Sequence, residues 1–359
     1  MNLFKATWGF LFRLFPCPTE TGLRKIGNPS EESPVLVTCN FYTTVQRLSR
    51  ALRGQDVWLL VAESRGVNVW CAACGNEFNT RSVVSAIKTS GIEEAVSHRT
   101  VILPPLGAAG ISAREVEKQT GWHTRWGPVR ARDIPAYLNA RRKRTEAMKR
   151  ATYTLVERLD TALGSLFPFY SLVALAFLGF APHLLGYFLL TLALTFLIFF
   201  GLCPWIPGKH GWQKVLFLDA ILGLALAAVV FWPPATTRPV RTILIMAMLL
   251  FALHGGELGG LSSTWASDFD PLMARLGLRA IGNTRFAGTT RTDLLIGARL
   301  LTHNTEDCSS CGACVAVCPL GVWDRGPDRR VVLERREACT ACCACLTQCP
   351  EGAITAQPV

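Results

Sequence analysis

The sequence contains no low-complexity tract, no small-residue cleavage site behind its apolar N-terminus, and few charged residues across a long middle portion. The missing cleavage site argues against a removed secretory signal, because the apolar stretch Met1–Pro16 is also short. It carries Lys5 and Arg13 and is followed by Cys17-Pro18-Thr19-Glu20. We therefore expect residues 1–33 to form an amphipathic segment at a membrane interface.

Charged residues are scarce between Leu163 and Leu261, where four apolar runs are separated by short polar loops. Each run has about 18–20 residues, enough to cross about 30 Å of hydrocarbon. This pattern predicts a transmembrane region of four helices at residues 163–261. The predicted spans are Leu163–Phe180, Leu184–Leu202, Val215–Trp232 and Thr242–Leu261.

Acidic residues are fewer than basic ones, 26 against 37, which gives a formal net charge of +11. Much of the excess lies in the run Arg130–Arg158, directly before the first apolar run. A basic run at that place is the positive-inside signal of membrane proteins, so we expect no nucleic-acid partner. Residues 141–162, which overlap this run, are predicted to form a basic linker helix. Because four spans return the chain to its starting side, we predict a multi-pass protein of the cytoplasmic (inner) membrane with both soluble domains facing the cytoplasm.

Two ionisable residues, His254 and Glu257, fall within the fourth predicted span, and Asp219 lies near the start of the third. Ionisable side chains inside a membrane are candidates for function. Two roles stay open for them: a substrate path or coupling role, and a packing or interfacial role.

Residues 34–140 alternate strand-like and helix-like stretches, which indicates an α/β domain with a mostly parallel sheet. In such sheets, ligands bind at the carboxyl ends of the strands. Residues 262–302 are predicted to be a linker with one helix, Thr292–Leu301. The predicted strands of the domain are Val35–Thr38, Val57–Val61 and Val101–Leu103, and its helices are Tyr42–Arg53, Arg81–Thr89, Ser112–Gly121 (with Ser112 as N-cap) and Asp133–Ala140.

Nine of the 14 cysteines fall within Cys308–Cys349, in two runs of the form C-x2-C-x2-C-x3-C-P. In such runs three thiolates hold one [4Fe–4S] cluster and the fourth crosses to the other cluster. Zinc sites favour paired C-x2-C units with a longer gap, so the spacing here argues against zinc. Because it is the spacing of metal ligands and not of disulfides, we infer a reducing cytosol. Residues 303–359 are therefore predicted to be a bacterial-type 2[4Fe–4S] ferredoxin domain. The first cluster is assigned to Cys308, Cys311, Cys314 and Cys349, and the second to Cys339, Cys342, Cys345 and Cys318.

Cys343 stands outside this eight-ligand pattern, as either a spectator thiol or a substrate or metal contact. A further pair, Cys71-x2-Cys74, follows a predicted strand in the N-terminal domain. On residue type alone it is a redox pair, half of a metal site, or two buried thiols.

The stretch Asn68-Val69-Trp70-Cys71-Ala72-Ala73 resembles the cap-helix motif of the mercury-methylating corrinoid proteins. These are relatives of the corrinoid iron–sulfur protein of the acetyl-CoA pathway. The C-terminal domain resembles the two-cluster ferredoxin that is normally a separate partner of that family, so this chain looks like a fusion of the two. The resemblance covers roughly residues 34–160 and includes Val35–Thr38 with Asn40, Val96–Arg99, Ile102–Ala108 and Gly127–Ile134.

The resemblance implies that Cys71 is the catalytic residue, as the lower axial ligand of a cobalamin-type corrinoid. It implies a corrinoid-dependent methyltransferase that receives a methyl group from a folate-type donor through a separate methyltransferase and passes it to a soft metal acceptor such as Hg(II). The fused ferredoxin, reduced by a low-potential electron donor, would reduce the cobalt. The residues implied to bind the cofactor are Thr38, Asn40, Asn68, Val69, Trp70, Cys71, Ala72, Leu106 and Gly107.

The chain departs from the family in three places. Cys39 stands where the family usually has a small residue. The family motif continues Gly-Lys-Gly-Thr-Phe-Gly-Thr after the two alanines, where this chain has Cys74-Gly75-Asn76-Glu77-Phe78-Asn79-Thr80. The partner ferredoxin carries a terminal cysteine pair, where this sequence has Thr355-Ala356-Gln357-Pro358-Val359. Two alternatives therefore stay open: a corrinoid methyl carrier to another acceptor, and a membrane-bound electron-transfer ferredoxin without methyltransferase activity.

Overall fold

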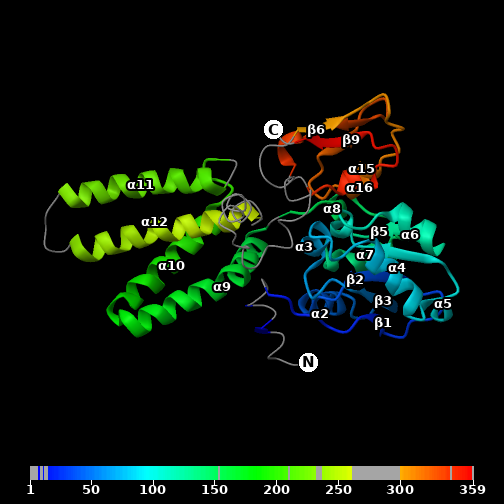
Figure 1. Ribbon diagram of the computed structural model, residues 1–359, viewed down its shortest axis with the longest axis horizontal. Coiled ribbons are helices and arrows are strands. Elements are labelled where there is room, and N and C mark those ends of the chain that lie inside the picture. Colours follow the sequence, from blue (N-terminus) through cyan, green and yellow to red (C-terminus); the bar gives the residue numbers. More distant parts are fainter. Residues whose placement is uncertain are drawn as a thin grey trace, which may run out of the picture. The chain divides into compact units, whose positions relative to one another are not determined.

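The computed structural model describes residues 7–8, 11, 15–152, 154–208, 211–231, 237–260, 300–339 and 342–357. The chain divides into two compact units. One contains Phe15–Thr152 and Ile281–Val359 together with Met1–Gly9, and the other contains Tyr153–Ala280 with Phe10–Leu14. The N-terminal α/β domain and the cysteine-rich C-terminal domain therefore belong to the same unit, and the long helices form the other (Figure 1).

The α/β domain is built on a five-stranded sheet in the order β1-β3-β2-β4-β5. Strands β2 to β5 are mutually parallel, and β1 pairs antiparallel with β3 at one edge. The predicted mostly parallel sheet is thus confirmed. Its strands are β1 (Gly22–Ile26), β2 (Val35–Cys39), β3 (Val57–Ala62), β4 (Thr100–Leu103) and β5 (His123–Trp126).

The two edge strands were not predicted from the sequence. Strand β1 falls within residues 1–33, so the prediction of an amphipathic segment there is wrong for Gly22–Ile26. Its sequence Gly-Leu-Arg-Lys-Ile has two central basic residues, and His-Thr-Arg-Trp of β5 is half polar. Edge strands tolerate such residues because one side of their backbone has no neighbouring strand.

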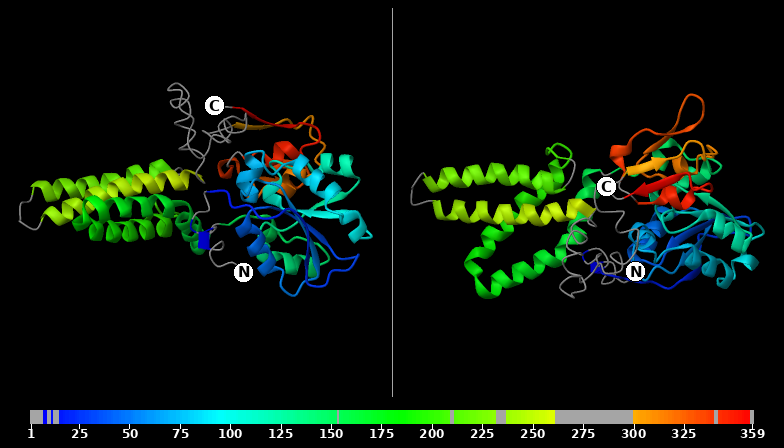
Figure 2. Two further views of the ribbon diagram at one scale, coloured as in Figure 1. Left: turned by 60° about the horizontal axis from the view of Figure 1, so that its bottom comes forward. Right: turned by 45° about the horizontal axis from the view of Figure 1, so that its top comes forward.

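The central strands are buried on both faces, as is usual for parallel sheets covered by helices. Alternate residues enter two separate cores, so Val37 and Leu60 lie in one and Leu36 and Leu59 in the other. The second core is closed by α2 (Tyr42–Ala51) and α7 (Ile134–Asn139). The first is closed by α4 (Thr80–Thr89), α5 (Ile92–Ala95) and α6 (Ala113–Thr120), so helices cover both faces (Figure 2).

The helix ends follow local capping chemistry. Helix α6 begins after Ser112, whose hydroxyl accepts the backbone N–H of Glu115, and stops at Gly121 in the left-handed conformation. The predicted N-cap of this helix is confirmed. The basic segment 141–162, predicted as a linker helix, is not continuous: it contains α8 (Glu146–Lys149) and the start of α9 at Leu155.

The other unit contains α9 (Leu155–Phe180), α10 (Pro182–Leu202), α11 (Gly211–Phe231) and α12 (Thr237–Gly260). Within the described residues, Pro182–Leu202 and Gln213–Phe231 are long and apolar enough to span a membrane. A third candidate is the pair Leu155–Gly164 and Leu166–Phe180, bent by 53°. Four spans remain a prediction.

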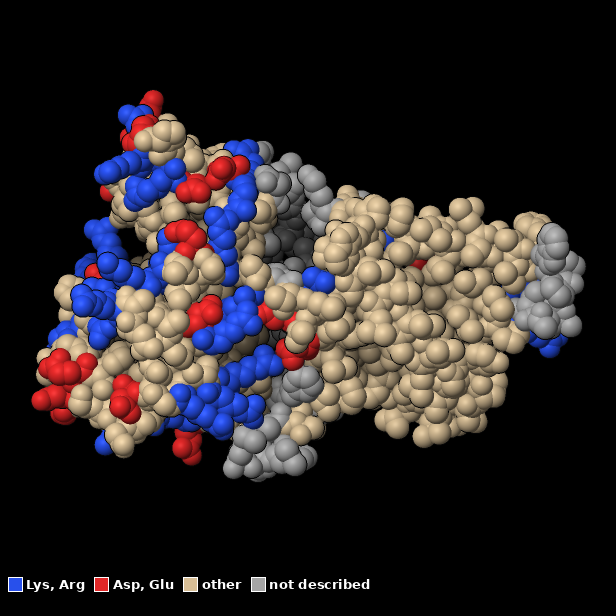
Figure 3. Space-filling view, turned by 180° about the vertical axis from the view of Figure 1, so that it is seen from behind, with Lys and Arg blue, Asp and Glu red and all other residues tan. Residues whose placement is uncertain are grey.

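The bend in α9 and the exposed surface of this unit both follow from the sequence. Pro168 lies inside α9, where its ring opposes the carbonyl of Gly164 four residues earlier. Large apolar side chains face outward, including Phe180 (93% exposed) and Phe231 (86%). Figure 3 shows this unit with few charged residues, whereas acidic and basic side chains are spread over the other unit. An apolar surface of this extent marks contact with lipid or protein.

The cysteine-rich domain consists of two small antiparallel ladders and two short helices. Its core includes Trp323, Val322 and Val331. Most of the predicted helix Thr292–Leu301 lies outside the described residues, and its last two residues belong to a strand. The elements are β6 (Leu300–His303), α15 (Ala313–Val317), β7 (Trp323–Arg325), β8 (Val331–Leu333), the 3-10 turn η3 (Arg336–Ala338), α16 (Ala344–Gln348) and β9 (Ile354–Gln357).

Candidate functional site

The carboxyl edge of the sheet opens between β2 and β4. These strands pair only at Val35 with Val101 and Leu36 with Ile102, although β2 continues to Cys39 beside β3. The chain leaves β2 toward β3 on one side and later reaches β4 on the other, so this is the topological switch point at which such sheets bind ligands.

A short helix, α3 (Val69–Cys74), follows β3 and covers this edge. Its approach loop is fixed by Asn40, whose side-chain oxygen accepts the backbone N–H groups of Ser64 at 3.0 Å and Gly66 at 2.9 Å. The Ser64 hydroxyl donates to the same oxygen at 2.8 Å, and the Asn40 amide donates to Glu63 at 3.1 Å. Asn40 is 2% exposed, so its contacts position the loop that leads into α3.

Helix α3 has one buried and one outward side. Asn68 is its N-cap and accepts the backbone N–H of Cys71 at 3.0 Å. Ala72 and Ala73 are fully buried, whereas the Cys71 thiol is exposed and Cys74 is half-buried. The helix therefore presents Cys71 outward on a locally fixed backbone.

The loop after β4 packs closely against the backbone of α3 and of the segment that follows it. A Cβ atom at Gly110 would lie 2.4 Å from the carbonyl oxygen of Phe78 and 2.8 Å from that of Ala73, so only glycine permits this approach. Gly107, in the 3-10 turn η1 (Pro105–Gly107), is in close contact with the buried Phe78 ring. Phe78 and Thr80, retained from the family motif, are thus scaffold residues, since Thr80 accepts the backbone N–H of Ser112 at 2.9 Å.

The structure therefore brings most of the predicted cofactor residues together on α3 and η1. Val69, Trp70 and Leu106 are half-buried beside the exposed Cys71. Thr38 and Asn40 instead lie beneath the surface at the end of β2, each 2% exposed.

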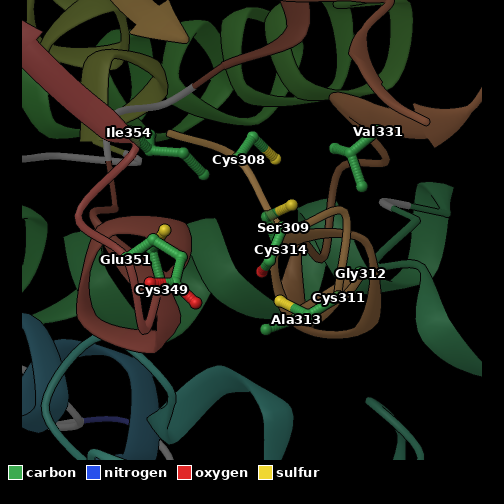
Figure 4. Close-up of a pocket in the computed structure, with 10 residues that line it drawn as sticks. All are labelled: Cys308, Ser309, Cys311, Gly312, Ala313, Cys314, Val331, Cys349, Glu351 and Ile354. Carbon is green, nitrogen blue, oxygen red and sulfur yellow. The ribbon is translucent and has the colours of Figure 1, made fainter. Parts of the chain in front are cut away.

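In the cysteine-rich domain, one pocket is lined by Cys308, Cys311 and Cys314 of the first run and Cys349 of the second. Figure 4 shows these four side chains around the pocket. Burial raises the pKa of Cys314 to about 12. Because cluster ligands bind as thiolates, a metal centre must displace this proton, as metal sites do. Four soft donors around one cavity fit a [4Fe–4S] cluster.

The remaining ligands form a second neighbourhood. The thiol of Cys345 interacts electrostatically with those of Cys318 and Cys339. The thiol of Cys342 interacts in the same way with those of Cys345 and Cys318. Burial raises the pKa of Cys342, and the next contribution comes from Cys74 of α3. The indole nitrogen of Trp323, which lies in the same core as Cys345, is buried and has no hydrogen-bond partner among the described residues.

The second cysteine run also contacts the α/β domain directly. The amide nitrogen of Gln348, on α16, donates to the carbonyl oxygens of Ala108 at 2.8 Å and Ile111 at 2.6 Å. Its amide oxygen accepts the backbone N–H of Ala113 at 3.2 Å, at the start of α6. One side chain thus satisfies both donors and acceptors of the loop that supports α3.

Further contacts surround this one. The Thr347 hydroxyl donates to the carbonyl oxygen of Ala109 at 2.9 Å, and Arg144 donates to that of Ala316 at 3.0 Å. Sequence reasoning missed all of these residues. The available signal was a break in the repeat, because Gln348 and Thr347 occupy the places of Val317 and Ala316 in the first run. An apolar cluster lies between the domains and contains Ala108, Trp126, Val317, Cys342 and Ala344.

His254, on α12, is fully buried among aromatic rings at centroid distances of 5.2–6.2 Å. Neither ring nitrogen has a hydrogen-bond partner among the described residues. The side chain of Glu257 lies outside them. The surrounding rings are those of Tyr170, Phe196, Phe199, Phe200 and Phe251.

Comparison with known proteins places the N-terminal α/β domain and the cysteine-rich domain in recognised classes. Residues 14–138 match the family described as CO dehydrogenase/acetyl-CoA synthase delta subunit, and residues 307–354 match the 4Fe-4S dicluster domain. The chain therefore joins an α/β domain related to that synthase family to an iron–sulfur domain, and both predictions are confirmed at this level.

The particular relatives are gamma subunits of the acetyl-CoA decarbonylase/synthase complex. That of Methanopyrus kandleri is 36% identical over 125 residues, covering 34% of this chain and 27% of the relative. That of Methanocaldococcus jannaschii is 38% identical over 109 residues, covering 30% and 22%. The matched region spans about a quarter of the length of these relatives.

Proposed function

We propose that this protein is a membrane-anchored, corrinoid-dependent methyltransferase with a built-in ferredoxin. Cys71 would hold the cobalt of the corrinoid through its thiolate, and the residues of α3 and η1 would line the surface that binds the cofactor. The single observation that carries the proposal is the exposed Cys71 thiol on an N-capped helix at the switch point of the sheet. The similarity of this domain to acetyl-CoA decarbonylase/synthase gamma subunits supports it.

When bound, the corrinoid supplies a cobalt ion that carries and releases a methyl group. The protein's own part would be to fix a thiolate donor for that ion. Asn68 and the buried Ala72 and Ala73 hold the backbone of α3, and Asn40 holds the loop that precedes it. A thiolate is a strong donor and disfavours low-valent cobalt, so a strong reductant is required.

The ferredoxin domain is proposed to supply that reductant, with clusters on Cys308, Cys311, Cys314 and Cys349 and on Cys339, Cys342, Cys345 and Cys318. The cavity shared by both runs supports the crossed assignment of the first cluster. A covalent tether raises the effective concentration of the reductant at the cobalt site.

The methyl donor is proposed to be a folate-type compound used through a separate methyltransferase, and the acceptor a soft metal ion such as Hg(II). The apolar helices of the second unit are proposed to anchor the chain by four spans in the cytoplasmic membrane, with both soluble domains facing the cytoplasm. Four spans would accommodate the apolar surface of α9–α12.

The test uses the full-length protein purified with cobalamin. We expect a base-off corrinoid spectrum in the wild type, and its loss or a marked shift in Cys71→Ala. Cys74→Ala, one turn along the same helix, is the matched control and should keep the wild-type spectrum. An unchanged spectrum in Cys71→Ala, or stoichiometric zinc without cobalt, contradicts the proposal.

The acceptor is tested separately by supplying the methylated protein with Hg(II), other soft metal ions and metalloids. Methyl transfer to Hg(II) supports the proposed acceptor. Transfer to another acceptor alone keeps the corrinoid chemistry and replaces mercury as the substrate.

A further inference from the structure

The two cysteine runs differ in what surrounds them. The first run contributes Cys311, which is exposed, and lines a pocket with Glu351. The second run carries α16, whose Gln348 and Thr347 bind the loop 108–113. The first run also reaches this contact, through the Ala316 carbonyl oxygen, which accepts from Arg144, and through Val317. The two runs therefore differ in that the side-chain hydrogen bonds to the loop 108–113 come from the second run.

The contact between the two domains buries apolar residues around Cys342, a ligand of the second predicted cluster. Cys342 packs with Ala108 and Trp126 of the α/β domain in the apolar cluster between the domains. Ala108 is fully buried and Ala344 is 3% exposed. Cys74 of α3 is an electrostatic neighbour of Cys342. The pocket of Cys308, Cys311, Cys314 and Cys349 is lined by residues of the ferredoxin domain.

From this asymmetry we propose that α16 and the loop 108–113 form a specific intramolecular docking surface, which seats the cluster of Cys318, Cys339, Cys342 and Cys345 against the cap helix as the electron exit of the ferredoxin domain. The cluster of Cys308, Cys311, Cys314 and Cys349 receives electrons from an external low-potential one-electron donor protein. Each transfer moves one electron, oxidising the donor and reducing the acceptor by one. This inference rests on the proposed function for the identity of the final acceptor.

Gln348→Glu tests the docking surface. The substitution keeps the shape of the side chain but replaces the donor to Ala108 and Ile111 with a carboxylate oxygen, which their carbonyls repel. Gln119→Glu, at an exposed position of α6, makes the same chemical change away from the contact. Ala108→Glu disrupts the contact from the α/β side, so agreement between the two interface variants shows that the contact is responsible.

Hydrogen–deuterium exchange is measured on the cluster-loaded, full-length protein without corrinoid. We expect the amides of residues 108–113 and 344–349 to exchange about tenfold faster in both interface variants, because the docked state opens more often. Gln119→Glu should match the wild type. Equal exchange in all four proteins, at unchanged iron content, overturns the docking surface.

Thiol alkylation gives a second readout with an internal reference. In the docked protein Cys74 should react more slowly than the exposed Cys71, and Gln348→Glu should accelerate Cys74 about threefold or more while leaving Cys71 unchanged. Equal rates for Cys74 in wild type and variant contradict its placement beside the second cluster.

With cobalamin loaded, stopped-flow reduction of the cobalt should slow about tenfold in Gln348→Glu as the effective concentration of the docked donor falls. Reduction at the wild-type rate overturns the electron exit. If no cobalamin binds to the wild type, the proposed function fails, while the exchange and alkylation results still decide whether the domains dock.

Discussion

The two cysteine runs are a sequence repeat that the fold uses in two different ways. Their ligand positions coincide, yet the residues between the ligands do not. Where the first run has Gly312, the second has Cys343, and both adopt the left-handed conformation at the start of a short helix. Where the first has Val317, buried in the contact, the second has Gln348, which binds the α/β domain. The ligand spacing is common to both runs, whereas the residues between the ligands differ at positions that contact the α/β domain.

The largest expected effect comes from removing one cysteine ligand from each predicted cluster in turn. Cys311→Ser should cost about half of the iron, because one of two equal clusters is lost. It should leave exchange protection of residues 108–113 intact. Cys345→Ser, at a buried position, should lose the other half and also the protection at the contact. Iron analysis and hydrogen exchange measure both, and equal loss of protection in the two variants would remove the distinction between the runs.

Substitutions at the two left-handed positions, Gly312 and Cys343, should have smaller effects, one destabilising the domain and the other nearly neutral. A Cβ at Gly312 would meet the Arg325 guanidinium, which binds the carbonyl oxygens of Ser310 and Cys311. Gly312→Ala should therefore destabilise the domain by about 1–3 kcal/mol. Cys343→Gly should change stability by less than about 1 kcal/mol, because relief of the positive φ offsets the lost burial of the thiol. Denaturant unfolding of the cluster-loaded protein measures both.

A large loss of stability in Cys343→Gly would contradict this expectation. It would show that the thiol makes a contact stronger than the backbone strain, and would turn Cys343 from a spectator into a functional candidate.

The sequence was informative where chemistry is local. The cysteine spacing predicts the ferredoxin domain, and the strand-like stretches predict three of the four parallel strands. Ser112 predicts the cap of α6. Strand β1 was missed because Arg24 and Lys25 break its apolar pattern, and only pairing with β3 makes it a strand.

Other features depend on residues far apart in the chain. Gln348 and Ala108 are separated by 240 positions, so no local pattern indicates their contact. Asn40 was predicted to bind the cofactor from the resemblance alone. Its buried hydrogen bonds to Ser64 and Gly66 show that it fixes the loop before α3, which accounts for an asparagine at that place.

Trp323 gives a prediction on the redox difference between the clusters. Its indole N–H is buried in the same core as Cys345 and has no hydrogen-bond partner among the described residues, so we expect it to donate to a ligand sulfur of the bound cluster. Hydrogen bonds to ligand sulfur stabilise the more negative, reduced cluster. Trp323→Phe should therefore lower the potential of the second cluster by about 40 mV, which corresponds to about 1 kcal/mol. Redox titration followed by electron paramagnetic resonance measures it, and a fall of both potentials together would assign the effect to general loosening of the core.

The smallest expected effect concerns Thr347, whose hydroxyl donates a hydrogen bond to the carbonyl oxygen of Ala109 across the contact at 2.9 Å. Thr347→Val keeps the side-chain shape and removes one neutral donor, so the docked state should weaken by about 0.5–1.5 kcal/mol. Exchange at residues 108–113 should then rise by a few-fold, less than in Gln348→Glu. Thr355→Val is the matched control, because that hydroxyl pairs with Thr302 within the ferredoxin domain. If Thr355→Val opens the contact as far as Thr347→Val does, the protection of the loop reflects the stability of the ferredoxin domain as a whole. If only Thr347→Val does so, the hydroxyl that replaces Ala316 of the first run is part of what makes the second run the docking side.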